Sequence, residues 1–199
     1  MKFISFYTGH YQWDAEQLIK SMVKLGINNY DVEYRDQIGN WEANTQMKAS
    51  FILGKLKEND AVVWTDADSR IRQVPSLFDT ITTDVAMLFM PKELAGDFIL
   101  PEHSILQNVD SYLQSGTMYF KNNDKVIKLL ERWIQLNSQD SRQWDQWTLQ
   151  VALQESDVTI THLPPQYVYI DGNNSQLYAG IRPVIEHTQA SRRFKDKIR

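Results

Sequence analysis

The sequence predicts a single α/β domain in which helices flank one mixed sheet. Two observations carry this prediction. Over the first 65 residues, β-rich runs and helical repeats alternate in the order strand, helix, strand, helix, strand. The C-terminal third changes to short extended runs separated by turns and looks more antiparallel. A chain of 199 residues has the size of one domain and can bury a core without disulfides.

The first five elements are predicted from the spacing of apolar residues and from the breakers between them. They are strands over 2–7, 31–35 and 61–65 and helices over 13–25 and 45–57. Gly26 stands at the stop position of the first helix, and Asn44 or Thr45 would cap the second. The run AVVWT at 61–65 is apolar throughout, as expected for a parallel strand covered on both faces. Such alternation predicts parallel strands joined by right-handed crossovers.

The remaining elements are predicted in the same way. They are strands over 84–90 and 117–121, helices over 126–136 and 143–153, and extended runs over 158–163, 166–170 and 182–187. The helix over 126–136 has a strongly apolar face, which predicts that it packs on the sheet. No internal repeat or low-complexity stretch interrupts the chain, so the prediction stays at one domain over 1–199.

Composition excludes several classes of function. The chain has no cysteine, which excludes thiolate catalysis and zinc sites built on Cys. The net charge of -4 argues against nucleic-acid binding, although the end of the chain, SRRFKDKIR, is locally basic. No stretch approaches the roughly 18 apolar residues of a membrane span, and the first apolar run is too short for a secretory signal. We therefore expect a cytoplasmic protein without a transmembrane segment.

Two carboxylates one residue apart, Asp66 and Asp68, follow the buried run at 61–65. Like charges this close repel unless a cation lies between them, and Mg²⁺ or Mn²⁺ would do so while completing its shell with phosphates and water. In open α/β sheets, ligands gather at the carboxyl ends of strands. The two residues could instead simply turn or cap the chain, because Asp favours both positions. Their place at a strand end favours the metal site.

The segment WTDADSRI resembles the DxD motif of GT-A nucleotide-sugar glycosyltransferases, distantly of the glycogenin-like branch. The resemblance extends to the segments FYTGHY, WEANTQMKASFILGKL, SGTMYF, WDQW and EHTQASRRFK. The last segment lacks the Gly and the Lys-Pro-Trp ending of the glycogenin-like branch. The resemblance implies a Rossmann-like GT-A fold whose N-terminal half binds nucleotide and metal. It also implies an acceptor-binding C-terminal half and a basic tail over 188–199.

The same resemblance implies a set of site residues. The metal would be bound by Asp66, Asp68 and His187. The donor would be contacted by Tyr7, Thr8, Lys48, Asp66, Ser115 and Gly116, with Arg192, Arg193 and Lys195 approaching its diphosphate. The catalytic candidates beside the transferred sugar are Asp145 and Gln146.

The residues by themselves support this set unevenly. His187 ends the apolar run PVIEH, and basic residues follow it within eight positions, so a metal ligand and phosphate-pairing cations could converge there. An exposed or structurally hydrogen-bonded histidine is the alternative. Lys48 could be an ordinary solvated lysine on its helix. Asp145 could simply cap a helix, although a helix N-terminus also suits polar ligands.

The implied reaction is transfer of a glycosyl group from a nucleoside diphosphate sugar, of UDP or GDP type, to a hydroxyl of a glycan, lipid-linked or protein acceptor. Mn²⁺ or Mg²⁺ would assist it. Asp145 and Gln146 suit either a retaining or an inverting outcome.

Three other functions stay open at this point. An apolar strand followed by DxDS also resembles a haloacid dehalogenase-like phosphatase, although that nucleophile usually stands on the first strand. A nucleotidyltransferase usually begins with a Gly-rich basic loop, which FYTGHYQWD is not. A non-catalytic module that binds a sugar nucleotide or a glycan could share the fold.

Overall fold

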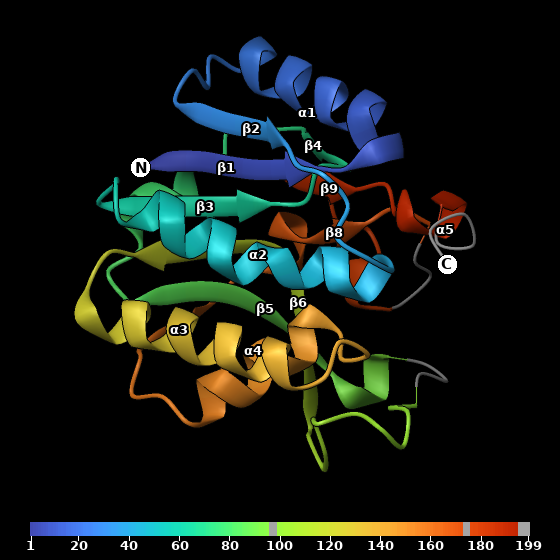
Figure 1. Cartoon of the computed structure of the whole chain (residues 1–199). Helices are drawn as coiled ribbons and strands as arrows, with labels where there is room; N and C mark the ends of the chain where they lie inside the picture. Colours follow the sequence, from blue (N-terminus) through green and yellow to red (C-terminus); the bar gives the residue numbers. More distant parts are fainter. Residues whose placement is uncertain (96–98, 173–175, 195–199) are drawn as a thin grey trace.

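A six-stranded mixed sheet forms the centre of the protein, whose computed structural model describes residues 1–95, 99–172 and 176–194 (Figure 1). Its spatial order is β2-β1-β3-β6-β5-β7. The strands are β1 (Lys2–Tyr7), β2 (Tyr30–Tyr34), β3 (Ala61–Thr65), β5 (Val85–Pro91), β6 (Ser111–Lys121) and β7 (Ile160–His162). A smaller sheet, in the order β4-β9-β8, contains β4 (Ser69–Ile71), β8 (Tyr169–Ile170) and β9 (Ile185–His187).

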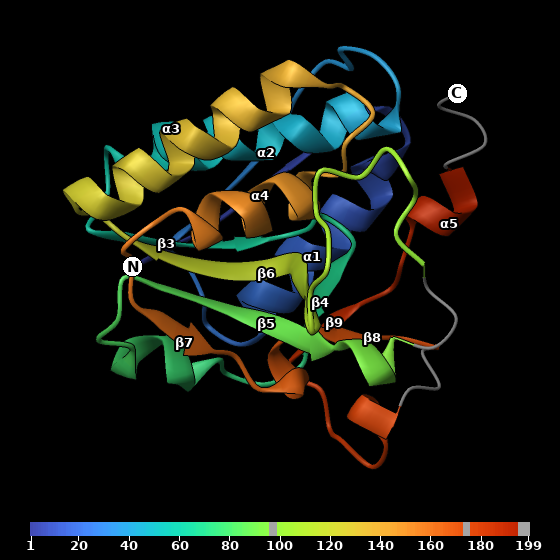
Figure 2. The ribbon, with the colours of Figure 1, turned by 90° about the horizontal axis from the view of Figure 1, so that it is seen from below.

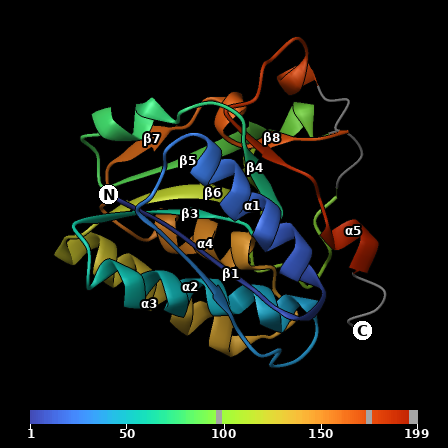
Figure 3. The same cartoon turned by 90° about the horizontal axis from the view of Figure 1, so that it is seen from above.

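Helices cover both faces of the large sheet. The helices are α1 (Gln12–Lys24), α2 (Trp41–Leu56), α3 (Asp124–Gln139), α4 (Asp145–Gln154) and the short α5 (Ser191–Phe194). Helices α2, α3 and α4 lie on one face, and α1 lies on the other (Figure 3). Because strand side chains alternate between faces, Val62 and Trp64 pack under α2–α4 while Val63 packs under α1. Each face therefore has its own hydrophobic core.

The direction of the strands divides the sheet into two parts. Strands β2 and β3 both pair parallel with β1, which confirms the parallel winding predicted from the first five elements. Strand β6 runs antiparallel to both β3 and β5, so the whole sheet is mixed, as predicted. The antiparallel character predicted for the C-terminal third is wrong in part, because β7 pairs parallel with β5 and β8 parallel with β9. Only the β4–β9 pair follows it among the described C-terminal strands.

Helix α2 begins earlier than predicted, and its cap is a different residue. The side chain of Asn40 accepts a hydrogen bond from the Ala43 N–H at 2.9 Å, so Asn40 is the N-cap. Asn44, predicted as a cap together with Thr45, lies inside the helix instead. Its buried amide accepts from the Ile38 N–H at 2.9 Å and donates to the Gly39 carbonyl at 3.1 Å. Asn44 thus ties the preceding loop to the helix.

Strand β6 is longer than predicted and is irregular where it passes the acidic residues. Its register against β5 shifts between Met87 and Leu88, whose partners are Met118 and Gln114. Residues 115–117 are therefore a bulge relative to β5, while Thr117 still pairs with Thr65 of β3. Bulges re-aim side chains next to functional sites. This one places the segment Ser-Gly-Thr beside the end of β3.

Candidate active site

The acidic turn, residues 66–68, connects β3 to β4. The Ser69 N–H donates to the Asp66 carbonyl at 3.0 Å, and the Asp66 N–H donates to the Gly116 carbonyl at 2.8 Å. The turn is thus held both by its own chain and by the bulge of β6. Strand β4, which was not predicted, begins directly after it and pairs antiparallel with β9.

This strand pairing brings His187 to the acidic turn. Ser69 lies opposite His187 in the β4–β9 register, although the two residues are 118 positions apart. Asp66, Asp68 and His187 each offer a ligand atom, and these atoms all lie within 4.8 Å of one another. Two carboxylates with an imidazole suit Mn²⁺ or Mg²⁺.

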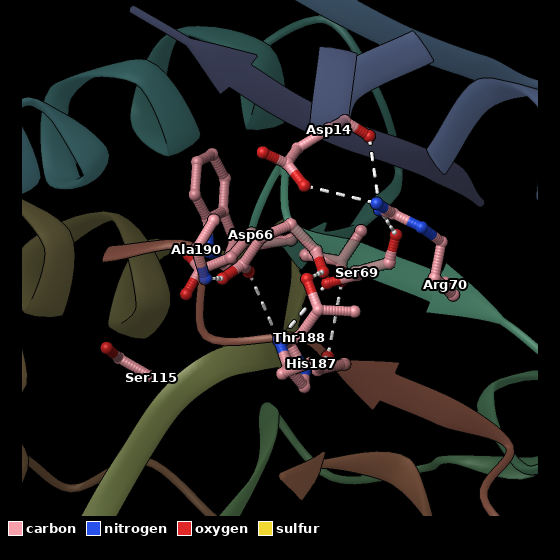
Figure 4. A network of polar contacts seen from close by, with 12 residues as sticks. Asp14, Asp66, Ser69, Arg70, Ser115, His187, Thr188 and Ala190 are labelled. Atoms are coloured by element: carbon pink, nitrogen blue, oxygen red, sulfur yellow. Dashed lines mark hydrogen bonds and ion pairs between the residues drawn. The ribbon is translucent and has the colours of Figure 1, made fainter. Parts of the chain in front are cut away.

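Hydroxyl groups fix the imidazole of His187 (Figure 4). Its Nδ1 lies 3.1 Å from the Ser69 hydroxyl, and its Nε2 lies 2.9 Å from the Thr117 hydroxyl. The Thr65 hydroxyl donates to Ser69 at 2.6 Å. One arrangement satisfies these hydroxyl groups: Ser69 donates to Nδ1, and Nε2 donates to Thr117. Hydrogen bonds to the ring of a metal-binding histidine fix the orientation of that ring.

The two carboxylates of the acidic turn have different surroundings. Desolvation raises the pKa of Asp66, the Lys48 ammonium lowers it, and repulsion from Asp68 leaves it above its usual value. Desolvation also raises the pKa of Asp68, but the nearby His187 imidazole and a hydrogen bond from the Ala190 N–H outweigh this and hold its pKa below the usual value. The Ala190 N–H donates to Asp68 Oδ2 at 2.8 Å. A cation between the two carboxylates would remove their repulsion.

Lys48 reaches from α2 into the site and is only 4% exposed. Its Nζ lies 3.1 Å from Asp66 Oδ1 and 2.8 Å from Asp145 Oδ2. Desolvation lowers the pKa of Lys48, but Asp145 and Asp66 raise it by more, so its pKa is above the usual value. The Ser115 hydroxyl also donates to Asp145 Oδ2, at 3.0 Å. Lys48 is therefore a buried cation that links the acidic turn to the start of α4.

A cavity of about 820 Å³ opens over these groups. It is lined by residues that the sequence had nominated: Tyr7, Thr8, Lys48, Asp66, Asp68, Ser115, Gly116, Asp145, Gln146, His187 and Arg192. An apolar part of the wall comes from Met90, Leu94, Ala95, Tyr112, Val168 and Ile170. The cavity therefore joins a charged region at the acidic turn to an apolar region at the ends of β5 and β8.

One predicted residue lies elsewhere, and another falls outside the described residues. The guanidinium of Arg193 pairs with Asp14 of α1 at 2.9 and 3.0 Å and does not line the cavity among the described residues. Lys195 lies outside the described residues. Asp14 is 1% exposed and also accepts from Arg70, the residue after Ser69, at 3.1 Å (Figure 4).

Sequence reasoning missed several residues that shape the site. The indole of Trp64 donates to Asp66 Oδ1 at 3.0 Å, and its place in the predicted strand gave no sign of this. Tyr11 lines the cavity; its burial, together with Asp68 and Asp66, raises its pKa to about 12. Ser69 could have been found, because it directly follows the acidic turn. Gln189 also lines the cavity, between His187 and Arg192.

No helix in the described part of the chain has both the length and the apolar character needed to cross a membrane.

Comparison with family models shows one family for this chain. Residues 12–199 match the family model described as nucleotide-diphospho-sugar transferase. No curated protein matches the chain. Among solved structures, one similar chain is a glycosyltransferase involved in the glycosylation of the major capsid of PBCV-1. Its TM-score is 0.67 at 10% identity, over 99% of this chain and 98% of the other.

Two further solved structures are similar. An active-site mutant of LgtC has a TM-score of 0.61 at 10% identity, over 94% of this chain and 86% of the other. The bifunctional glycosyltransferase WbbM, in its apo form, has a TM-score of 0.59 at 13% identity, and the match covers 95% of this chain but 45% of that one. At such identities these likenesses show the fold, which is the mixed α/β arrangement described above.

Proposed function

The chain belongs to the nucleotide-diphospho-sugar transferase family, and from that premise we propose a metal-dependent transfer of a sugar from a nucleoside diphosphate to an acceptor hydroxyl. The donor would be of UDP or GDP type, and the acceptor a glycan, a lipid-linked molecule or a protein. The observation that carries the proposal is the convergence of Asp66, Asp68 and His187 beside the buried Lys48–Asp145 pair, on the wall of one cavity.

The charges of the site suit the leaving group. As the bond between the sugar and the diphosphate breaks, negative charge grows on the diphosphate. Mn²⁺ or Mg²⁺ held by the acidic turn and His187 would act as a Lewis acid for that charge. Arg192 lines the same cavity and would pair with the phosphates. Arg193 would reach them only by leaving Asp14, which would keep Arg70 as its partner.

The sugar would lie toward the start of α4. Lys48 and Ser115 both bind Oδ2 of Asp145, so this carboxylate is held in one orientation. A fixed carboxylate beside the anomeric carbon stabilises the positive charge that develops there. Gln146, next to it, also lines the cavity and would bind a sugar hydroxyl. These roles hold for a retaining or an inverting reaction.

The nucleotide and the acceptor would occupy different parts of the cavity. Tyr7, the last residue of β1, and Thr8, which follows it, line the cavity and would contact the base and ribose. The apolar wall would receive the acceptor, and it comes from both halves: from residues 90–95, which include η3 (Lys92–Leu94), and from Tyr112, Val168 and Ile170. The metal ligand His187 is supplied by the second half, so the metal site itself joins both halves.

The test uses the donor alone. UDP, GDP, CDP and dTDP sugars are screened with Mn²⁺ for a thermal shift and for slow hydrolysis, with and without EDTA. We expect one donor to respond, EDTA to abolish hydrolysis, and Asp68→Asn to lower its rate by about 100-fold or more, since several kcal/mol of leaving-group stabilisation would be lost.

Asp157→Asn is the matched control, because the side chain of Asp157 is 78% exposed and faces Lys125. It should leave hydrolysis unchanged. Binding of a donor without turnover would favour the non-catalytic module. If no donor binds or is hydrolysed with any metal, the proposal is wrong.

A further inference from the structure

Gln189 has a backbone conformation that a residue with a side chain seldom adopts. Its φ is +51°, in the left-handed region. Among the described residues, the other non-glycine with positive φ is Asn108, and asparagine tolerates this region far better. Residues held in such conformations cluster at functional sites, because the surrounding structure must impose them. The strain at Gln189 therefore points to a local requirement.

Asp68 imposes this conformation from both sides of Gln189. The Thr188 N–H and the Thr188 hydroxyl both donate to the Asp68 carbonyl at 3.1 Å. On the other side, the Ala190 N–H donates to the Asp68 carboxylate at 2.8 Å. The Arg192 N–H then donates to the Gln189 carbonyl at 3.0 Å. The turn that carries Gln189 is thus fastened to the acidic turn and opens α5.

One polar atom of the Gln189 side chain lacks a hydrogen-bond partner among the described residues. This atom, Oε1, is buried, while the side chain lines the main cavity with His187 and Arg192. A buried carbonyl oxygen without a donor costs free energy that folding alone does not recover. A molecule that enters the cavity can supply a donor, because the Gln189 side chain lines it. Sugar and ribose hydroxyls are donors of the right kind.

We propose that Gln189 Oε1 accepts a hydrogen bond from a hydroxyl of the nucleotide-sugar donor and so contributes to donor specificity. The proposal rests on the proposed function. It follows from the position of Gln189, which is fastened to Asp68, where the diphosphate would bind. The ribose and the transferred sugar lie on either side of the diphosphate of the donor, so the hydroxyl belongs to one of these two. The left-handed backbone conformation of Gln189 is retained because it orients this amide for the hydrogen bond.

Three variants separate binding from stability. Gln189→Met keeps the length and the strain but removes the amide. Gln189→Gly removes the amide and relieves the positive φ. Gln189→Asn keeps a shorter amide on a residue that tolerates the conformation. The matched control is Gln154→Met, which changes an exposed residue at the end of α4.

Dissociation constants are measured by calorimetry with Mn²⁺, for the nucleoside diphosphates of uridine, guanosine, cytidine and thymidine and for their hexose conjugates. We expect Gln189→Met to weaken the hexose conjugate by about three- to tenfold, the effect of one neutral hydrogen bond. Equal weakening of the free diphosphate assigns the ribose hydroxyl, and weakening of the conjugate alone assigns the sugar.

Gln189→Gly should bind the hexose conjugate as weakly as Gln189→Met does, and its melting temperature should equal or exceed that of the parent protein. Gln189→Asn should weaken binding to a similar extent, because its shorter side chain withdraws the amide. Gln154→Met should change neither quantity.

The outcomes separate this inference from the function on which it rests. If the parent protein binds a donor and Gln189→Met binds it equally well, the inference is wrong and the proposed function stands. If binding falls only because Mn²⁺ affinity falls in a titration without nucleotide, Gln189 acts through the metal site and the inference is again wrong. If the parent binds no nucleoside diphosphate or conjugate, the proposed function fails and takes this inference with it.

Discussion

At the scale of single residues, Gly116 shows how closely the site is built. It lies in the bulge of β6, its carbonyl accepts from the Asp66 N–H, and its Cα faces the imidazole of His187. A Cβ added to Gly116 would stand 2.8 Å from Cε1 of His187 and 3.0 Å from Nδ1. Real Cβ atoms do not come so close to a ring held on both sides by hydroxyl groups. Glycine is therefore required here by a close approach.

Gly116→Ala should displace His187 and lower Mn²⁺ affinity by about tenfold or more, as loss of a ligand's supporting contacts does. Calorimetric titration of Mn²⁺ measures this. Gly54→Ala is the control: it lies inside α2 with open space around it, so it should keep the metal affinity and leave stability equal or higher. Wild-type Mn²⁺ binding by Gly116→Ala would show that His187 is not held in place for a metal.

At the scale of elements, Asp84 joins three segments at the far end of the sheet from the site. It directly precedes β5, and its carboxylate accepts from the N–H and the hydroxyl of Thr159, which precedes β7, at 2.8 Å each. It also accepts from Asn123, the N-cap of α3, at 2.8 Å. The hydrogen bond from the Thr159 N–H lowers the pKa of Asp84, desolvation raises it, and hydrogen bonds from the Thr159 and Asn123 side chains leave it below its usual value.

This lowered pKa predicts a loss of stability in acid. A carboxyl whose pKa is lower in the folded state adds stability above its ordinary value of 3.8, and that stability disappears as the pH falls through the folded value. Asp84→Asn should therefore lower the free energy of unfolding by about 1 kcal/mol at pH 7 and by less near pH 3. Urea unfolding at both pH values measures the difference. A deficit that is the same at both would mean that the charge of Asp84 is not what matters.

At the scale of the whole molecule, the helices α1 and α5 lie near each other (Figure 2) and are joined at Asp14. This buried carboxylate of α1 holds Arg70 at the start of the small sheet and Arg193 of α5. Both guanidinium groups also lie over the exposed ring of Trp13, at 5.3 and 6.0 Å from its centroid. Asp14 thus connects the first helix, the strand after the acidic turn and the last helix.

The two arginines should contribute unequally. Asp14→Asn leaves the buried Arg70 without its charge partner and should lower the free energy of unfolding by about 3 kcal/mol. Arg193→Gln removes a half-exposed partner and leaves Arg70 paired, so it should cost about 1 kcal/mol or less. Urea unfolding of both variants makes the comparison. Equal losses would mean that the attachment of α5, and not the burial of Arg70, governs stability here.

The sequence determined what depends on neighbours along the chain. Apolar spacing located the helices, and the alternation over the first 65 residues determined three parallel strands, because periodicity and breakers act within a few residues. The pair Asp66 and Asp68 could be placed at the end of β3 for the same reason. The helix boundaries were predicted less accurately: α2 begins at Trp41, because Asn40, and not Asn44, caps it. A local signal offers several polar residues for one cap, and the fold chooses among them.

Only the tertiary structure decided which distant groups meet. The direction of β6, its bulge at Ser115–Thr117 and the pairing of β4 with β9 all depend on hydrogen bonds between segments far apart in the chain. These pairings bring His187 to the acidic turn, while burial draws Lys48 between Asp66 and Asp145. Arg193, nominated for the diphosphate, lies instead on Asp14. A charged side chain pairs with the opposite charge that the fold places close to it and buries. The distance between two such groups depends on the tertiary structure, so it could not be predicted from one sequence.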